Sequence, residues 1–158
     1  MTTNSPPADD VPLPNRLARL LDSGHWPRTQ TEALRQNLKS LVPKERIQLV
    51  APKENSIFLC SPPFHTVAVD IAARQKRFGV DRFWSTYGAL ESISPELSLI
   101  IGDFGLGSDS PIVLDYRQSG STPSVLRLEW RKPEPNVWVR CAENFDEFAD
   151  MLGLTSAD

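Results

Sequence analysis

The chain has 158 residues, of which 40% are hydrophobic and 23% are charged, and its formal net charge at pH 7 is −3. This length suits one domain with a substantial core and is too short for two ordinary domains. No run of about eighteen apolar residues occurs, so we expect no membrane span. The first residues, MTTNSPPADD, lack the basic start and apolar centre of a secretory signal, and we expect a cytoplasmic protein.

The charge is divided unevenly along the chain. Residues 1–83 hold 12 Lys and Arg against 8 Asp and Glu, a net +4, whereas residues 84–158 hold 5 against 12, a net −7. An acidic second half is compatible with a basic protein partner and argues against a nucleic-acid-binding face there. Alternatively, the two halves complement each other within one fold.

The first residues predict a tail followed by the domain. Residues 1–14 are polar, contain four prolines and have too little apolar surface to fold, so we expect a flexible tail. The domain then covers residues 15–158. Asn15 is a candidate cap for a first helix over residues 16–23, which Gly24 would end.

A second helix is predicted shortly afterwards. Thr29 and Glu32 fit a capping box, although Thr31 could cap instead. The apolar residues that follow recur at helical spacing, which predicts one buried stripe. This stripe consists of Leu34, Leu38 and Leu41.

Three short elements come next. They are a helix over residues 43–49, a strand over residues 56–60 and a helix over residues 66–77. The last of these ends in a basic cluster, where cations suit the helix dipole, and we interpret the cluster as a solvated helix end rather than a nucleic-acid site.

Aromatic side chains gather on the next predicted turn, residues 82–87, which Asp81 can cap. Phe83, Trp84 and Tyr87 have helical spacing. We expect Phe83 and Tyr87 to pack in the core and Trp84 to be partly exposed.

The centre of the chain predicts a hairpin. Two short apolar runs, residues 97–101 and 111–116, flank a loop rich in Gly and Asp, which suits two strands paired antiparallel. Gly102, Gly105 and Gly107 would let this loop adopt positive φ angles.

Carboxylates accompany the same loop. Asp103 and Asp109 invite a calcium interpretation, but Gly105 and Gly107 stand where an EF-hand needs ligands. We expect at least one of the two carboxylates to accept hydrogen bonds from the loop's own N–H groups. Asp115 lies at the end of the second strand.

Two more strands and a helix complete the predicted α+β fold, a single domain with a mostly antiparallel central sheet packed by helices. Residues 124–130 and 136–141 alternate, which predicts one packed and one wet face. Asn144 can cap the last helix. Its predicted buried stripe consists of Phe145, Phe148, Ala149 and Leu152.

Catalytic and metal-binding patterns are missing from the sequence. His25 and His65 have no Cys or His at zinc-ligand spacing, and no Gly-x-Ser-x-Gly motif occurs. Cys60 and Cys141 each follow an apolar run and are expected to be reduced, at least partly buried thiols, although a redox pair would require them to be close in space. We expect no enzyme activity, no metal and no cofactor.

Two segments carry a resemblance to a known family. IGDFGLGSDSPIVLDYR, residues 101–117, resembles the core motif of the SUKH superfamily, which includes bacterial immunity proteins and yeast regulators of cell-wall assembly. ENFDEFADML, residues 143–152, resembles its closing helix, with Phe145 and Phe148 at the family's aromatic positions. The resemblance, most specific over residues 83–152, implies an α+β domain that binds other proteins and has no catalytic centre.

The functional prediction follows from this resemblance, from the acidic second half and from the missing catalytic pattern. We expect a non-catalytic protein-binding module, similar to SUKH immunity proteins, that neutralises a cognate nuclease-type toxin by occlusion, its partner being a basic toxin domain. The alternative is a regulatory or scaffolding protein that binds a cellular partner. The predicted partner-binding residues are acidic or aromatic: Asp103, Asp109, Asp115, Glu129, Trp130 and Trp138.

Overall fold

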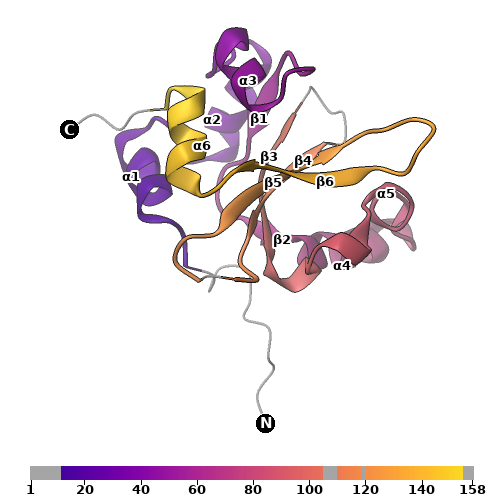
Figure 1. The fold of residues 1–158 in the computed structure, drawn as a ribbon. Helices are drawn as coiled ribbons and strands as arrows, with labels where there is room; N and C mark the ends of the chain where they lie inside the picture. Colours follow the sequence, from indigo (N-terminus) through magenta and orange to yellow (C-terminus); the bar gives the residue numbers. More distant parts are fainter. Residues whose placement is uncertain (1–11, 105–109, 119, 155–158) are drawn as a thin grey trace.

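The computed structural model describes residues 12–104, 110–118 and 120–154, and these form one α+β domain (Figure 1). The predicted α+β class with an antiparallel sheet packed by helices is confirmed. The helical elements are α1 (Asn15–Ser23), α2 (Gln30–Leu34), η2 (Arg35–Asn37), α3 (Lys44–Val50), α4 (Val67–Phe78), α5 (Arg82–Tyr87), η3 (Leu90–Ser92), η4 (Pro95–Leu97) and α6 (Phe145–Leu152). The strands are β1 (Ile57–Leu59), β2 (His65–Thr66), β3 (Ser98–Phe104), β4 (Pro111–Asp115), β5 (Ser124–Glu129) and β6 (Val137–Ala142).

The sheet is built outward from the predicted central hairpin. Its strands follow the order β1-β3-β4-β5-β6, with β2 also paired to β3, and every pairing is antiparallel. Leu99 pairs with Leu114 in the hairpin, and Leu128 of β5 pairs with Trp138 of β6. This register brings the end of β5 and the start of β6 to the same end of the sheet as the end of β3.

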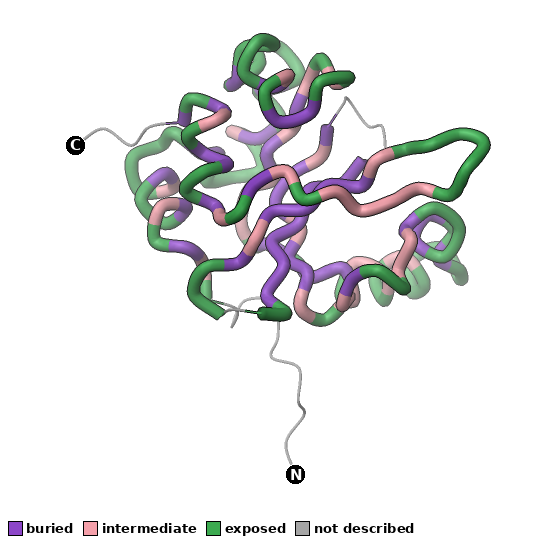
Figure 2. Tube along the Cα trace, in the orientation of Figure 1, coloured by how far each residue is buried: buried purple, intermediate pink, exposed green. Residues whose placement is uncertain are grey.

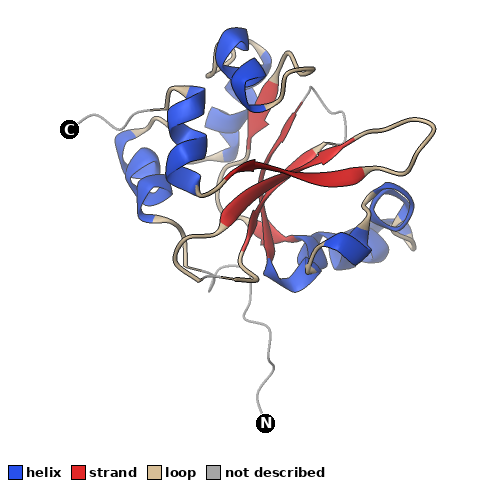
Figure 3. Ribbon diagram, in the orientation of Figure 1, coloured by secondary structure: helices blue, strands red, loops and turns tan. Residues whose placement is uncertain are grey.

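Both faces of the sheet are covered at β4 and β5, so the wet face predicted for β5 is wrong, whereas Arg140 of β6 is exposed. Helices α1, α3 and α6 pack on one face, and α4 with α5 on the other (Figures 1 and 3). Consecutive residues of β4 pack into different hydrophobic cores. Leu114 packs in the core under α1, α3 and α6, and Val113 packs in the core under α4 and α5. All five residues of β4 are buried (Figure 2). Alternation in β5 therefore separates two packed faces, and even Arg127 is only 7% exposed.

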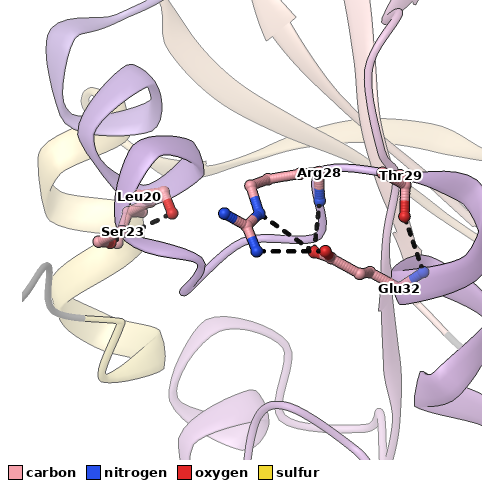
Figure 4. A network of polar contacts seen from close by, with 5 residues as sticks. All are labelled: Leu20, Ser23, Arg28, Thr29 and Glu32. Atoms are coloured by element: carbon pink, nitrogen blue, oxygen red, sulfur yellow. Dashed lines mark hydrogen bonds and ion pairs between the residues drawn. The ribbon is translucent and has the colours of Figure 1, made fainter.

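Local capping signals are confirmed at several helix starts. Thr29, and not Thr31, caps α2, with its hydroxyl oxygen accepting a hydrogen bond from the N–H of Glu32 at 3.1 Å. The Glu32 carboxylate in turn accepts from the backbone N–H of Arg28 (Figure 4). Asn144 caps α6 in the same way. By contrast Asn15 is not a cap, because α1 begins one residue earlier than expected and Pro14 stands at its N-cap.

The predicted leucine stripe of the second helix is wrong. The α-helix ends at Leu34 and continues as the 3-10 turn η2, so the 3.6-residue spacing does not hold. Leu38 is 92% exposed. Ala33 and Gln36 point inward instead.

Gln36 is buried because it completes the hydrogen bonding of the short strand β1. Its side-chain oxygen accepts from the N–H of Leu59 and its amide nitrogen donates to the carbonyl of Leu59, both at 2.9 Å. The same nitrogen donates to the carbonyl of Ala33. A primary amide offers both a donor and an acceptor, so it can replace a neighbouring strand at this one residue.

Gly102 has a role different from the predicted one. It lies inside β3 and not in a turn, and its φ angle is not positive. A Cβ atom there would lie 2.7 Å from the carbonyl oxygen of Phe58 in β1, so the close approach of the two strands requires glycine. The predicted loop residues Gly105 and Gly107 lie outside the described residues.

Replacing Gln36 tests the importance of this side-chain pairing. Gln36→Ala leaves the buried N–H and C=O of Leu59 without partners, and we expect the free energy of unfolding to fall by about 2–4 kcal/mol. The neighbouring Asn37→Ala, at an exposed position, is the matched control and should change it by less than about 0.5 kcal/mol. Urea denaturation measures both; equal midpoints for the two variants would contradict the pairing.

Candidate functional site

The predicted partner-binding residues do not form one cluster. Asp115 pairs with Ser98 and Ser124 at one end of the sheet, and Asp103 pairs with Pro111 at the other end. Asp109 lies outside the described residues. Glu129 ends the strand β5 and Trp130 follows it, while Trp138 of β6 pairs with Leu128, one residue before Glu129. Asp103, Glu129, Trp130 and Trp138 therefore lie at one end of the sheet, and Asp115 lies at the other.

Asp115 is held in a structural ion pair. The residue is 7% exposed. Its two carboxylate oxygens accept hydrogen bonds from the guanidinium of Arg117, each at 3.0 Å, and one of them also accepts from the backbone N–H of Arg117. This hydrogen bonding raises the pKa of Arg117. This geometry favours a structural role for Asp115, which holds the chain in place at the end of β4.

Asp103 bridges the base of the central connection. One of its carboxylate oxygens accepts a hydrogen bond from the N–H of Ser110 at 3.2 Å. The expectation that a carboxylate of this loop would bond the loop's own N–H groups is thus confirmed for Asp103. The side chain of Asp103 is partly buried, so its carboxylate is only partly accessible to a binding partner.

Glu129 lies between two arginines. Its carboxylate accepts from the Nε atom of Arg131 at 2.8 Å and from a terminal nitrogen of Arg127 at 3.2 Å. The hydrogen bond from Arg131 is the main reason that the pKa of Glu129 is lowered. With two cations beside one anion, this part of β5 is not the acidic surface that the sequence suggested.

Aromatic side chains form a layered cluster at the same end of the sheet. Trp138 stacks on Trp84, with the planes 7° apart and the ring centroids 6.4 Å apart. Tyr87 and Trp130 lie beside this pair with their ring centroids 4.8 Å apart. Tyr87 is 44% exposed and Trp130 37% exposed, whereas Trp84 is 2% exposed. The expected exposures of Tyr87 and Trp84 are therefore reversed, and Phe83 is buried as predicted.

Hydrogen bonds fix the inner pair of this cluster, the buried Trp84 and the half-buried Trp138. The indole N–H of Trp84 donates to the carboxylate of Asp70 at 2.7 Å, and the same carboxylate oxygen accepts from Arg74 at 2.9 Å. The indole N–H of Trp138 donates to the carbonyl of Gly88 at 2.8 Å. Since buried indole N–H groups need acceptors, these contacts set the orientation of both rings.

A cleft opens above the aromatic cluster. It has a volume of about 380 Å³ and lies between α5, η3 and the loop that joins β5 to β6. The amide of Asn136 donates to the carbonyl of Tyr87 at 3.1 Å and so ties the loop to the end of α5. Tyr87 and Trp130 form its aromatic wall, and Glu91, Lys132 and Glu134 are charged residues along it.

Only part of this cleft was predictable from the sequence. Trp130 was predicted as a partner-binding residue, whereas Tyr87 was assigned to the core and Glu91, Lys132 and Glu134 were not singled out. The run WRKPEPN, with a tryptophan beside a proline-containing hairpin loop, was an available signal of an exposed aromatic residue. That the loop lies beside α5 depends on the tertiary fold and has no local signal.

The turn that leads into the cleft is conformationally strained. Ala89 has φ 47° and ψ 48°, the left-handed region that costs a residue with a Cβ atom about 1–2 kcal/mol. The preceding Gly88 cannot carry a Cβ atom, which would lie 2.7 Å from the carbonyl oxygen of Trp84. Strain of this kind is found where the surrounding structure imposes the conformation.

A second cavity contains a thiol but no reactive nucleophile. Cys60, His65 and Asp70 all line a cavity of about 320 Å³ beside β1 and β2. Burial raises the pKa of the Cys60 thiol from 9.0 to about 12, so the thiol is protonated at neutral pH, whereas a nucleophilic cysteine needs a lowered pKa. Both cysteines are free and half-buried, as predicted.

Neither metal clusters nor membrane-spanning helices occur in residues 12–104, 110–118 and 120–154. No three His, Cys, Asp or Glu side chains there come together as a metal-binding group. None of the helices in this part of the chain has the length and apolar character that a membrane span requires.

Comparison of the chain with protein-family models, with curated proteins and with solved structures finds no match. The resemblance to the SUKH superfamily therefore stays a prediction from the sequence. The aromatic cleft is a candidate site on its own geometry.

Relieving the strained turn should stabilise the protein. Ala89→Gly removes the steric cost of the left-handed conformation but raises the entropy of the unfolded chain, and we expect a net gain of about 0.5–1 kcal/mol. Ala72→Gly, at an exposed position within α4, should instead lose about 1 kcal/mol. Thermal unfolding of both variants measures the difference; a loss in both would show that the turn is not strained.

The half-buried thiols should be chemically inert in the folded protein. A thiol pKa of about 12 rather than 9.0 lowers the thiolate fraction at pH 8 about a thousandfold for Cys60, and Cys141 has the same raised pKa. We expect labelling by a disulfide reagent at pH 8 to be at least a hundredfold slower in the native protein than in urea. Rapid labelling of one thiol in the native protein would place that thiol at the surface.

Proposed function

We propose that this chain is a non-catalytic protein-binding module and that its binding surface is centred on the aromatic cleft between α5 and the β5–β6 loop. The observation that carries the proposal is the pair of exposed rings, Tyr87 and Trp130, held 4.8 Å apart on a fixed aromatic base. Tyr and Trp side chains in such settings supply much of the binding energy of protein interfaces.

The chemistry of the cleft supports binding rather than catalysis. The wall-forming rings offer apolar area, and Asn136 uses its amide to hold the loop in place. The charged residues along the cleft, Glu91, Lys132 and Glu134, have exposed side chains, whereas catalytic acids and bases are usually held in buried surroundings.

The nature of the partner is proposed from the resemblance. An immunity protein of the SUKH type would use this surface to cover the active face of a nuclease-type toxin, which requires shape and charge complementarity but no catalytic residue. A regulatory or scaffolding protein would use the same surface on a cellular partner. The two proposals differ in the partner and not in the cleft.

Photo-crosslinking tests the position of the surface. A benzophenone amino acid in place of Trp130 should crosslink to the partner in the native cell, because the ring lies at the proposed contact. The same amino acid in place of Leu49, which is 58% exposed on α3, is the matched control and should not crosslink. Crosslinking from Leu49 alone would move the interface to the other side of the molecule.

Affinity measurements with the captured partner test the energetic role of the rings. Tyr87→Ala and Trp130→Ala should each weaken binding by at least about tenfold, the loss expected of an interface anchor, and Leu49→Ala should not. Charge reversal at Asp103 and Asp109 tests the acidic surface predicted from the sequence. If Tyr87→Ala and Trp130→Ala fold and bind with full affinity while the charge-reversed variant binds more weakly, the binding surface lies at the loop between β3 and β4 and not at the cleft.

Growth rescue distinguishes a toxin from another partner. The wild-type chain should protect cells that express a toxin domain encoded beside it, and Trp130→Ala should fail to protect at equal expression. A captured partner without toxicity, whose binding still needs Trp130, would favour the regulatory alternative.

A further inference from the structure

We propose that the cleft recognises an arginine side chain of the partner, whose guanidinium replaces the ammonium of Lys132 on the face of Trp130. This inference rests on the proposed function and names the group that the cleft would bind. Four features carry it: the position of Lys132, the exposed rings, the charges along the cleft and the fixed base beneath them.

Lys132 shows that the Trp130 ring already attracts a cation. Its Nζ atom lies 5.9 Å from the centroid of the ring, near the outer limit of about 6 Å for a cation–π contact. Lys132 itself is exposed on the β5–β6 loop and has a flexible side chain. A distant contact made by a mobile, hydrated ammonium is easily displaced.

The charges along the cleft favour a cationic ligand. Among the described residues that line it, Glu91 and Glu134 are acidic and Lys132 is basic. When a partner's cation takes the place of Lys132, two exposed carboxylates remain to pair with it. An acidic ligand would meet these carboxylates instead and be repelled.

The shape of the aromatic wall favours guanidinium over ammonium. The planes of Tyr87 and Trp130 are inclined by 36°, and both rings are partly exposed. A planar guanidinium stacks on such a ring, is less strongly hydrated than an ammonium and keeps its N–H groups free for carboxylates at its edge. Arginine is also enriched among the residues that anchor interfaces.

The base of the cleft is rigid before any ligand binds. Trp84 lines the cleft and is stacked on Trp138, and the indole N–H groups of these two rings are bonded to Asp70 and to the carbonyl of Gly88. Because the wall rests on groups that are already ordered, little conformational entropy is lost when a ligand enters.

A pair of short peptides tests the inference directly. The probes are an acetylated peptide amide with two adjacent arginines between glycines, and the same peptide with citrulline, which has nearly the same shape and no charge. Binding is followed by the NMR signal of the Trp130 indole N–H, assigned by its loss in Trp130→Phe. We expect the arginine peptide to shift this signal saturably and the citrulline peptide to bind at least tenfold more weakly.

Variants of the charged residues sharpen the test. Lys132→Met should tighten arginine-peptide binding by about threefold or more, because a competing cation is removed. The double variant Glu91→Gln with Glu134→Gln should weaken it at least threefold. Glu143→Gln, exposed at the start of the turn before α6, is the control and should leave binding unchanged. Dispersed NMR spectra check that each variant is folded.

Several outcomes would overturn the inference without touching the proposed function. They are equal binding of the two peptides, no shift with the arginine peptide, or weaker binding after Lys132→Met. In each of these cases crosslinking from Trp130 to a protein partner could still succeed. Failure of that crosslinking, with arginine-selective binding intact, would instead overturn the proposed function alone.

Discussion

The structure depends on the complete burial of the central strand β4. Every residue of Pro111–Asp115 is buried, and neighbouring side chains of the strand enter opposite cores. A strand of this kind needs cover on both faces, and no single helix can supply it. Helices α1, α3 and α6 cover one face and α4 with α5 the other, so segments from both ends of the chain are brought to the same sheet. The aromatic cleft forms because α5, on the second face, is short and ends beside the β5–β6 loop.

The aromatic residues of that region divide into a structural pair and an exposed pair. Trp84 and Trp138 have hydrogen-bonded N–H groups and stack nearly in parallel, which makes them part of the second core. Tyr87 and Trp130 contact each other at the edge of this core and remain accessible. One cluster can therefore both stabilise the fold and present a surface, since different rings do the two tasks.

Local interactions were predictable from the sequence, and interactions between distant segments were not. The caps by Thr29 and Asn144 involve residues three apart, and the central hairpin joins neighbouring runs. The spacing of Leu34 and Leu38 was misleading because the helix tightens into a 3-10 turn once Gln36 pairs with β1, 23 residues away. For the candidate site, Trp138 was predictable as an aromatic residue on a strand, and Trp130 as one at the end of a strand. Tyr87 was not predicted to be exposed, because the rotation of the short α5 is set by packing against α4 and β6.

The pairing of Gln36 with Leu59 also bears on self-association. β1 is an outer strand of the sheet, and an unpaired outer strand offers its backbone to other chains as a template for aggregation. Here a side-chain amide already occupies both polar groups of Leu59, and the strand is only three residues long. The exposed leucines of the neighbouring segment, of which Leu38 is the most accessible, thus lie beside an edge that cannot recruit a further strand at that residue. Apolar side chains are therefore exposed in this region, but the backbone N–H and C=O of Leu59, which could pair with a strand of another chain in a fibril, are already hydrogen-bonded.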